Sequence, residues 1–402
     1  MTVRGEPETP RVVMCVDMDA FYASVELRRH PEWRDVPMWV GGAARGVVLS
    51  ANYPARAYGV RGGMSSAQAR RLCPHAVCAP PDFDAYSEVS AGIVAILETF
   101  TARVESASID EAYLDLTGAG RTVGTPALVG ERLRAIVYDE QGIACSVGIG
   151  PNRLIAKMAT NSAKPDGLLE VRPEEVLAFL HPQPVEHLVG IGDSTAAKLR
   201  PLGVGTVADL AALPRSALQR EFGPRAGALL HDLAWGRDSS RVVAKPGERG
   251  VGCQETFGHD LADDAGVLAE LLRVVVKVAS RMRAAGVLGR TITLNLRYSD
   301  FSTASRALTL AAPTDVTDEF YAAARRLYAQ LRTPRARVRR VGVRVTGLVD
   351  RALVCLQPTL DEPDYGWRDA ERAADNVIRR FGPQAVRRAA LTRPVPKRPA
   401  PA

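Results

Sequence analysis

Near the beginning of the chain stands Val12-Val13-Met14-Cys15-Val16-Asp17-Met18-Asp19-Ala20-Phe21-Tyr22. Its five apolar residues, Val12 to Val16, predict a buried strand. A mixed acidic and basic stretch from Ala23 to His30 predicts a helix directly after it. Strand and helix in this order are typical of an α/β domain, so Asp17 is expected at the end of a buried strand.

A second acidic site, the pair Asp110-Glu111, lies at the start of another predicted strand. A hairpin is indicated by Arg103-Val104-Glu105, a polar turn and Ile109-Asp110-Glu111-Ala112-Tyr113-Leu114-Asp115-Leu116. Carboxylates gathered in a sheet repel one another, and one or two divalent cations would offset their charge. Magnesium prefers oxygen ligands, and two ions can act as a clamp for phosphoryl transfer. Asp17, Asp110 and Glu111 are therefore candidate metal ligands; the alternative is independent surface acids that cap turns.

The α/β pattern continues to about residue 172. Short strands are predicted at Met38 to Val40, Gly46 to Ser50 and Cys145 to Ile149, and helices at residues 84–100 and Asn152 to Ala159.

Residues 174–236 indicate several short helices. Among them, Leu188-Val189-Gly190-Ile191-Gly192 precedes Asp193 to Leu199, which is the pattern of a helix-hairpin-helix unit with a capped second helix. Gly190 and Gly192 would let backbone amides approach a phosphate at a helix N-terminus. A plain helical turn is the alternative.

Beyond a polar, basic stretch at residues 237–249, the pattern changes. Apolar and polar residues alternate along two of the strands predicted there, which indicates a sheet with one packed face and one open polar face. Arg297, Arg340 and Arg344 lie on the polar face, which is the best candidate for a phosphate backbone. The predicted order is strand 251–257, helix 262–285, strands 290–298 and 303–310, helix 314–332 and strand 338–348, a split βαβ arrangement.

The 402 residues suffice for two to four domains and carry a net charge of +7. Residues 1–240 hold 24 Lys and Arg against 28 Asp and Glu, whereas residues 241–350 hold 18 against 11 and residues 351–402 hold 10 against 6. A basic second half suits a polyanion, because neutralising phosphates releases counterions; a solvated basic face is the alternative.

Targeting signals and zinc motifs are not indicated. No apolar stretch approaches the ~18–20 residues of a membrane span, and the first ten residues lack the apolar segment of a signal peptide. The six cysteines form no C-x-x-C pair, which argues against zinc and for buried thiols in a reducing compartment. We expect a cytoplasmic protein.

Five segments closely resemble motifs of Y-family DNA polymerases of the bacterial polymerase IV type. They are residues 16–26 and 108–115, which resemble the two catalytic motifs, together with Ala51-Asn52-Tyr53-Pro54-Ala55-Arg56, Ser146-Val147-Gly148-Ile149-Gly150-Pro151-Asn152 and Ala163-Lys164-Pro165-Asp166-Gly167. The resemblance spans about residues 11–350 in the family's order.

The resemblance implies two Mg²⁺ ions, for which Mn²⁺ is an alternative, held by Asp17, Asp110, Glu111 and the Met18 carbonyl. It assigns Asp19 a structural role. Tyr22 matches the steric gate, an aromatic ring that collides with a 2′-hydroxyl and so selects deoxynucleotides; simple core packing is the alternative for such a ring.

Further residues match positions of the family that bind the incoming nucleotide. The planar guanidinium of Arg56 and the ammonium of Lys164 suit anionic oxygens. Leu49 is expected over the nascent base pair. The nucleotide-binding candidates are Phe21, Tyr22, Ser50, Tyr53, Arg56 and Lys164.

The implied fold is a right-hand polymerase that combines α/β and α+β domains. Its palm is residues 1–24 and 76–172, its small fingers 25–75, its helix-hairpin-helix thumb 173–238, its linker 239–249, its β-α-β-β-α-β little finger 250–350 and its tail 351–402. Template-directed DNA synthesis with low fidelity, translesion activity and no proofreading nuclease is the implied function.

The implied partners are primer-template DNA and dNTPs, and no membrane is involved. The resemblance also implies a monomeric protein that is associated with the nucleoid. In the tail, Gln357 and Leu360 partly resemble a sliding-clamp peptide, and residues 368–390 predict an amphipathic helix. Two rival interpretations are a non-catalytic DNA- or clamp-binding relative and a nucleotide cyclase. The first would have lost metal ligands that are present here, and the second would not need the hairpin unit or the basic domain.

Overall fold

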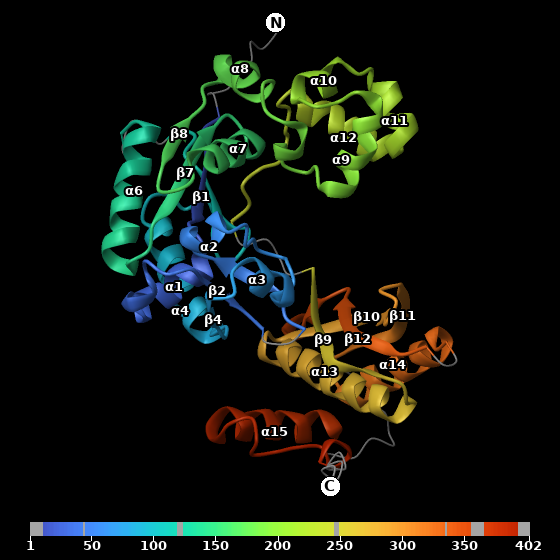
Figure 1. The fold of residues 1–402 in the computed structure, drawn as a ribbon. Helices are drawn as coiled ribbons and strands as arrows, with labels where there is room; N and C mark the ends of the chain where they lie inside the picture. Colours follow the sequence, from blue (N-terminus) through green and yellow to red (C-terminus); the bar gives the residue numbers. More distant parts are fainter. Residues whose placement is uncertain are drawn as a thin grey trace, which may run out of the picture. The chain divides into compact units, whose positions relative to one another are not determined.

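The computed structural model describes residues 11–42, 45–118, 124–244, 249–333, 336–354 and 366–392. The chain forms two compact units, Met1–Pro246 and Gly247–Ala402, and Figure 1 follows the chain through both. The boundary falls inside the stretch 239–249 that we expected to be a linker.

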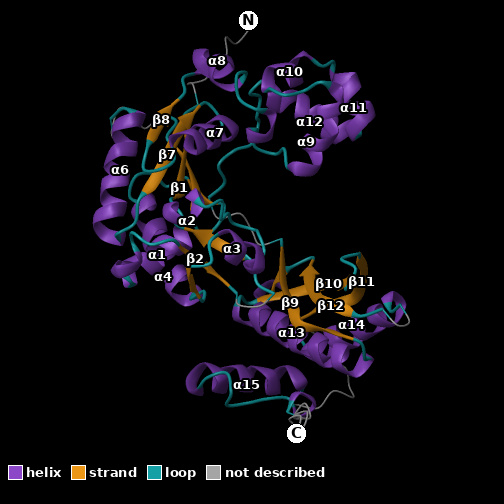
Figure 2. Cartoon of the chain, in the orientation of Figure 1, coloured by secondary structure: helices purple, strands orange, loops and turns teal. Residues whose placement is uncertain are grey.

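A five-stranded sheet forms the middle of the first unit (Figure 2). Its strands are β1 (Val13–Met18), β5 (Val104–Ser106), β6 (Glu111–Asp115), β7 (Cys145–Gly150) and β8 (Leu168–Glu170). They lie in the order β5-β6-β1-β7-β8, and the expected hairpin is present as the antiparallel pair β5 and β6. All six residues of β1 are buried, because this apolar strand has a neighbour on each side and helices over its faces.

Helices cover both faces of this sheet. They are α4 (Phe83–Glu98), α6 (Pro126–Gln141) and α7 (Arg153–Ala163). Met14 and Val16 of β1 belong to the core shared with α4 and α6, whereas Val13 and Cys15 pack with Ala156 of α7. Successive residues of a strand point to opposite faces, so Asp17 points to the α7 side.

The helix that follows β1 is α1 (Phe21–Arg29). It begins two residues before the expected start at Ala23, after a short turn in which Ala20 takes the left-handed conformation, with φ of 48°. Non-glycine residues rarely adopt this conformation. The turn brings Tyr22 onto the first turn of the helix.

A second, three-stranded sheet carries the region expected as fingers. Its elements are β2 (Met38–Gly41), β3 (Val48–Ala51) and β4 (Val77–Ala79), with α2 (Tyr53–Ala57), α3 (Ser66–Leu72) and the one-turn 3₁₀ helix η1 (Pro31–Trp33). The strand order is β3-β2-β4, and Trp39 lies fully buried in its separate small core.

Short helices make up the remainder of the first unit. They are α8 (Val176–Leu180), α9 (Asp193–Leu199), α10 (Val207–Ala212), α11 (Arg215–Phe222) and α12 (Pro224–Ala234), with the one-turn 3₁₀ helices η2 (Pro173–Glu175), η3 (Val185–His187) and η4 (Arg200–Leu202). The expected hairpin glycines lie between η3 and α9, and Gly190 has a φ of +99° that favours glycine. We had expected a capped second helix, but the N-cap of α9 is Gly192 and no side chain caps this helix.

The second unit contains the expected order of strands and helices. Its elements are β9 (Gly250–Leu261), α13 (Asp264–Ala284), β10 (Val287–Tyr298), β11 (Thr303–Thr314), α14 (Thr317–Leu331) and β12 (Val338–Thr346), followed by β13 (Val349–Asp350) and the 3₁₀ helix η5 (Arg351–Leu353). The sheet order β11-β10-β12-β9 is antiparallel throughout. Consequently β9 and β10, joined by α13, run parallel with β12 between them, which is the predicted split βαβ arrangement.

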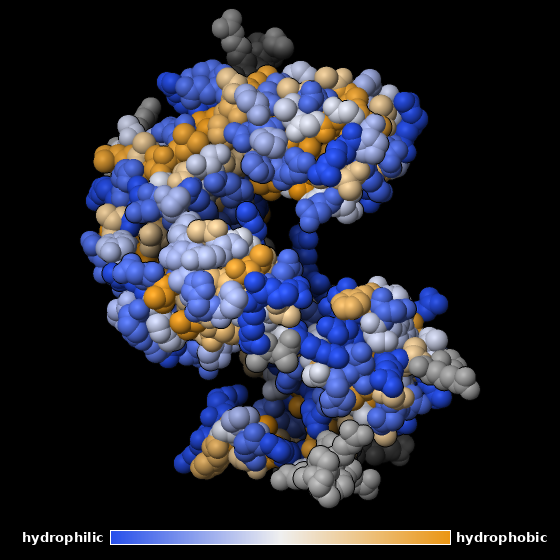
Figure 3. Space-filling model, in the orientation of Figure 1, coloured by the Kyte–Doolittle hydropathy of each residue, from blue (hydrophilic) through white to orange (hydrophobic). Residues whose placement is uncertain are grey.

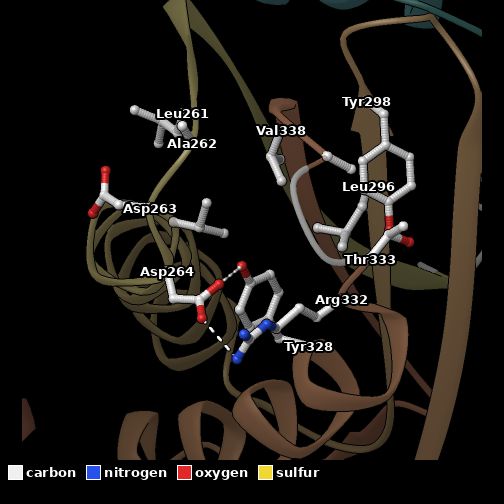
Figure 4. Close-up of a pocket in the computed structure, with 12 residues that line it drawn as sticks. Leu261, Ala262, Asp263, Asp264, Leu296, Tyr298, Tyr328, Arg332, Thr333 and Val338 are labelled. Atoms are coloured by element: carbon white, nitrogen blue, oxygen red, sulfur yellow. Dashed lines mark hydrogen bonds and ion pairs between the residues drawn. The ribbon is translucent and has the colours of Figure 1, made fainter.

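In the second unit, α13 and α14 are tied together at a small pocket of about 130 Å³. Figure 4 shows that Asp264, at the start of α13, faces Tyr328 and Arg332. The Tyr328 hydroxyl donates to Asp264 Oδ1 at 2.8 Å, and Arg332 lies 2.8 Å from Oδ2. These contacts join α13 to the end of α14, away from the sheet's polar face.

The amphipathic helix predicted over residues 368–390 is shorter in the structure. It is α15 (Trp367–Phe381), which has Gly382 as its C-cap and is followed by the separate 3₁₀ helix η6 (Ala389–Leu391). It packs on α13 through charged groups. Arg283 of α13 makes ion pairs with Glu371 at 2.6 Å and Asp375 at 2.5 Å, and the side chains of Arg283 and Glu371 are less than 10% exposed.

The distribution of hydrophobic residues on the surface and the state of the cysteines are those of an ordinary globular protein. Hydrophobic residues lie scattered among hydrophilic ones on the face shown in Figure 3. Among the described residues, no helix has the length and apolar character needed to cross a membrane. The five cysteines in the described part of the chain are free thiols, and burial raises the pKa of Cys15 and Cys145 to about 12.

Candidate active site

Three acidic residues come together at one end of the first unit's main sheet. Asp17 lies directly opposite Glu111 in the antiparallel pair of β1 and β6. The Met18 amide donates to the Asp110 carbonyl at 2.9 Å, so Asp110 lies at the same end. The register therefore gathers Asp17, Met18, Asp110 and Glu111 from two distant parts of the chain.

Lys157 of α7 balances two of these carboxylates. Its Nζ donates to Asp17 Oδ2 at 2.5 Å and to Glu111 Oε2 at 2.7 Å. Burial is the largest single effect and opposes the charged ammonium, but the Asp17 charge, together with smaller effects that include the hydrogen bonds to Asp17 and Glu111, outweighs it and raises the pKa of Lys157. The lysine is therefore a full cation between the two acids.

Lys164 also reaches Asp17, as its ammonium donates to Oδ1. Sequence reasoning found Lys164 but missed Lys157. Lys164 is the C-cap of α7 and has an extended backbone, so helical periodicity does not relate the two lysines and no local signal singled out Lys157. The packing of α7 against β1 brings Lys157 to Asp17.

The donor set fits a cation that prefers oxygen. Two carboxylates share the ammonium of Lys157, so positive charge is required where they meet. The Asp110 side chain has a different partner, since its Oδ1 accepts from Ser108 Oγ at 2.5 Å. Within the described ranges, no three His, Cys, Asp or Glu side chains form a ready metal cage. Magnesium commonly uses one or two carboxylates together with substrate phosphates instead of such a cage, and these residues suit that mode.

Asp19 has the structural surroundings that we expected. It is 4% exposed, and burial raises the pKa of its carboxyl group. Its oxygens accept from Ser146 Oγ at 3.0 and 3.1 Å and from the Asp166 amide at 2.7 Å. Asp19 thus ties the end of β1 to β7 and to the loop after α7.

Tyr22 lies half-buried on the first turn of α1. Burial, and then the Asp110 carboxylate, raise the pKa of its hydroxyl, so this hydroxyl is within reach of the charge of the acidic cluster. Phe21, which we expected to contact a nucleotide, is only 2% exposed and belongs to the core. Its side chain therefore packs internally, and only its backbone could face a ligand.

The region that we expected to be the fingers contributes Tyr53 and Arg56 of α2. The Arg56 guanidinium lies 4.9 Å from the Tyr53 ring centre and donates to the Ala51 carbonyl at 2.9 Å. Burial, and then the Asp19 carboxylate, raise the pKa of Tyr53 to about 12, so Tyr53 approaches the acids. Ser50 on β3 is 7% exposed, which leaves its hydroxyl little access to a ligand. Leu49 is partly buried against the core.

The second unit places the three predicted arginines on one face of its sheet. Arg297 is the direct partner of Arg340, and Arg344 is the partner of Thr293. Arg340 Nε is buried without a hydrogen-bond partner in the part of the chain that the structure describes. The alternation that predicted this face is confirmed by the buried residues Ile292, Leu294, Leu296 and Tyr298. The clamp-peptide candidates Gln357 and Leu360 lie outside the described residues.

Known protein families match most of the chain. The impB/mucB/samB family matches residues 16–161, its C-terminal domain matches residues 248–359, and the thumb domain of DNA polymerase-iota matches residues 186–238. The first match includes both acidic motifs and Lys157, the second includes the polar sheet face, and the third includes the glycine hairpin.

Curated relatives cover most of the chain as well. The DNA polymerase IV of Alkalilimnicola ehrlichii is 40% identical over 341 residues, which are 84% of this chain and 96% of that protein. The DNA polymerase IV of Halorhodospira halophila is 39% identical over 85% of this chain and 96% of that protein. That of Streptomyces coelicolor is 39% identical over 85% of this chain and 72% of its own length.

Solved structures share the fold. A Y-family DNA polymerase chimera of Dbh and Dpo4 superposes with a TM-score of 0.77 at 28% identity, covering 84% of this chain and 99% of the chimera. An insertion ternary complex of Dbh DNA polymerase has a TM-score of 0.61 at 27% identity, covering 84% of this chain and 99% of that one.

Proposed function

Because the chain belongs to the Y-family of translesion DNA polymerases, we propose that it extends a primer at the acidic cluster of Asp17, Asp110 and Glu111. It is a DNA-directed DNA polymerase of the polymerase IV type, with the family's palm, fingers, helix-hairpin-helix thumb and little finger. The pairing of Asp17 with Glu111 across β1 and β6 carries the proposal, since it joins the two acidic motifs in one site.

Enzymes of this family depend on divalent metal ions. We assign two Mg²⁺ ions, with Mn²⁺ as an alternative, to Asp17, Asp110, Glu111 and the Met18 carbonyl. When bound, such ions activate the primer 3′-hydroxyl and offset charge on the phosphates. Lys157 offsets the charges of Asp17 and Glu111.

The incoming dNTP is recognised by cationic and aromatic groups around the acids. Lys164 and Arg56 are assigned to the triphosphate, where they counter the charge that builds up in the transition state. Tyr53, whose hydroxyl stays neutral up to a high pH, is suited to donate a hydrogen bond to a phosphate oxygen. Tyr22 lies next to Asp110, which suits a ring that excludes a 2′-hydroxyl.

Primer-template DNA is assigned to two surfaces. Arg297, Arg340 and Arg344 offer guanidinium groups on an open sheet face, where they suit a phosphate backbone. Gly190 and Gly192 offer backbone amides in the thumb. The proposal also includes clamp binding through Gln357 and Leu360 and a monomeric state. It places the enzyme at the nucleoid in a reducing cytoplasm, which the free thiols support. It further includes low fidelity and the lack of a proofreading nuclease.

Primer extension by two isosteric variants tests the catalytic assignment. Asp110→Asn and Glu111→Gln should each lower extension by at least about 10³-fold, because each removes a charge needed in the transition state, while affinity for primer-template DNA stays near that of the parent. Asp115→Asn, at the far end of β6, is the matched control. Extension by both variants at the parental rate would reject the site and favour the non-catalytic relative.

A further inference from the structure

Four aromatic residues form a cluster around the proposed steric gate: Phe21 and Tyr22 of α1, and Phe83 and Tyr86 of α4. The Tyr22 ring lies 4.8 Å from that of Tyr86, 5.5 Å from that of Phe21 and 6.2 Å from that of Phe83. The Tyr22 and Phe83 rings meet edge to face, at 78°, which is a favoured geometry for aromatic pairs. Three rings therefore support the half-buried side chain of Tyr22.

Tyr86 joins two successive turns of α1. Its ring contacts Tyr22, and its hydroxyl donates to Glu26 Oε1 at 2.5 Å. Tyr22 and Glu26 are four residues apart and so lie on the same face of the helix. Tyr86 is fully buried and Glu26 is 5% exposed, so loss of this hydrogen bond would leave a polar group buried with weaker partners.

A second link joins the same helices one turn further along α1. Arg29 lies 2.7 Å from Asp82, and Asp82 caps α4 by accepting from the Ala85 amide at 3.2 Å. Arg29 is also 3.9 Å from Glu26. A shift of α1 along α4 would therefore break the Tyr86 and Asp82 contacts together.

The beginning of α1 depends on this support. No side chain of the described residues caps the helix at Ala20, and Ala20 itself has a left-handed backbone. Local sequence therefore does little to hold the first turn in place. Phe83 is 53% exposed, although it packs against Tyr22 and Tyr86, so its ring covers the aromatic cluster from the solvent side.

We propose that Phe83 and Tyr86 are positioning residues that hold the Tyr22 ring against an incoming sugar and thereby determine part of the discrimination against ribonucleotides. The inference rests on the proposed role of Tyr22 as the steric gate. A ring that excludes a single hydroxyl must be held within about 0.5 Å, and the α4 contacts restrict both its tilt and the position of its helix.

The test compares kcat and KM for one dNTP and its matching rNTP, with and without the support. Phe83→Ala should lower the dNTP-to-rNTP ratio of kcat/KM by about tenfold, the scale of one lost pocket contact. The change should come mainly from a lower KM for the rNTP. Phe83→Tyr, which keeps the ring, should restore the ratio. Tyr86→Phe, which keeps the ring but loses the bond to Glu26, should show a smaller decrease in the same direction.

Matched controls are Tyr138→Ala, which removes an aromatic ring, and Tyr138→Phe, which removes a hydroxyl, both at an exposed tyrosine of α6. Tyr22→Ala is measured alongside. If Tyr22→Ala relaxes sugar selection while Phe83→Ala and Tyr86→Phe keep the parental ratio, the positioning role is rejected and the gate stands. If Tyr22→Ala leaves the ratio unchanged, the gate assignment fails, and the role of α4 fails with it. An equal loss of kcat/KM for both nucleotides would indicate a merely structural role and would also overturn the inference.

Discussion

Asp17 and Glu111 face each other as direct partners in the antiparallel pair of β1 and β6. Like charges in that position destabilise a sheet, and both side chains are largely buried, with 11% and 20% exposed. Lys157 relieves the repulsion by donating to both. A pair that needs a cation to be tolerated is typical of a functional site, where stability is sacrificed for chemistry.

Replacing Lys157 should destabilise the metal-free protein. Lys157→Gln leaves two facing carboxylates without their shared cation, and we expect a loss of about 2 kcal/mol in the free energy of unfolding, less than for a fully buried pair. Urea unfolding in EDTA measures this loss. Added Mg²⁺ should recover part of it, and Lys198→Gln on α9 is the control. Equal stability of variant and parent in EDTA would contradict the charge-balancing role.

Removal of Lys164 should affect nucleotide use more than DNA binding. Lys164→Ala takes away a cation expected to counter transition-state charge, so kcat/KM for dNTP insertion should fall by about 10²-fold. Single-nucleotide insertion kinetics measure the effect, with primer-template affinity as the internal reference. A variant that loses only DNA affinity would disprove the triphosphate assignment.

The Tyr53 hydroxyl should ionise only at high pH. Its pKa is raised to about 12 in the folded protein, above the unfolded value near 10. Stability from Tyr53 is therefore fully present below about pH 10 and is lost as the pH rises toward 12. An ultraviolet difference titration of the parent against Tyr53→Phe should show the missing tyrosine ionising near pH 12. Ionisation near pH 10 would mean that Tyr53 is not held beside Asp19.

Arg283 should hold the C-terminal helix on α13. Arg283→Met removes the shared partner of Glu371 and Asp375, and unpaired buried charges are strongly unfavourable. Backbone amides of α15 should then exchange with deuterium at least about tenfold faster. Arg379→Met, at an exposed position of the same helix, serves for comparison. Unchanged protection of α15 would show that other contacts are sufficient.

The little-finger arginines should contribute to the salt dependence of DNA binding. Changing Arg297, Arg340 and Arg344 together to Gln should weaken primer-template binding and reduce the slope of log K against log salt by about 3, one for each phosphate contact. Titrations at several salt concentrations measure the slope. Arg326→Gln, on the exposed side of α14, should leave it unchanged. A triple variant with the parental slope would remove this face from the DNA interface.

Much of the architecture could be predicted because its signals are local. Apolar runs and alternation identified most of the strands of both units, and the order of elements after residue 249 identified the split βαβ arrangement. Element ends were less predictable. The helix after β1 starts at Phe21 and not at Ala23, because an unusual turn at Ala20 replaces the expected longer connection. Likewise, the burial of Phe21 was missed because a motif indicates a position in the chain but not which side chain faces the core.

By itself the sequence determined the order of elements, the acidic motifs and the family, since these depend on residue type, spacing and periodicity over a few turns or strands. Only the tertiary structure decided which acids face each other, that Lys157 lies between Asp17 and Glu111, and that Phe83 and Tyr86 of α4 support Tyr22. The physical reason is that strand register and the packing of a helix on a sheet depend on contacts between residues far apart in the chain, which no local pattern encodes.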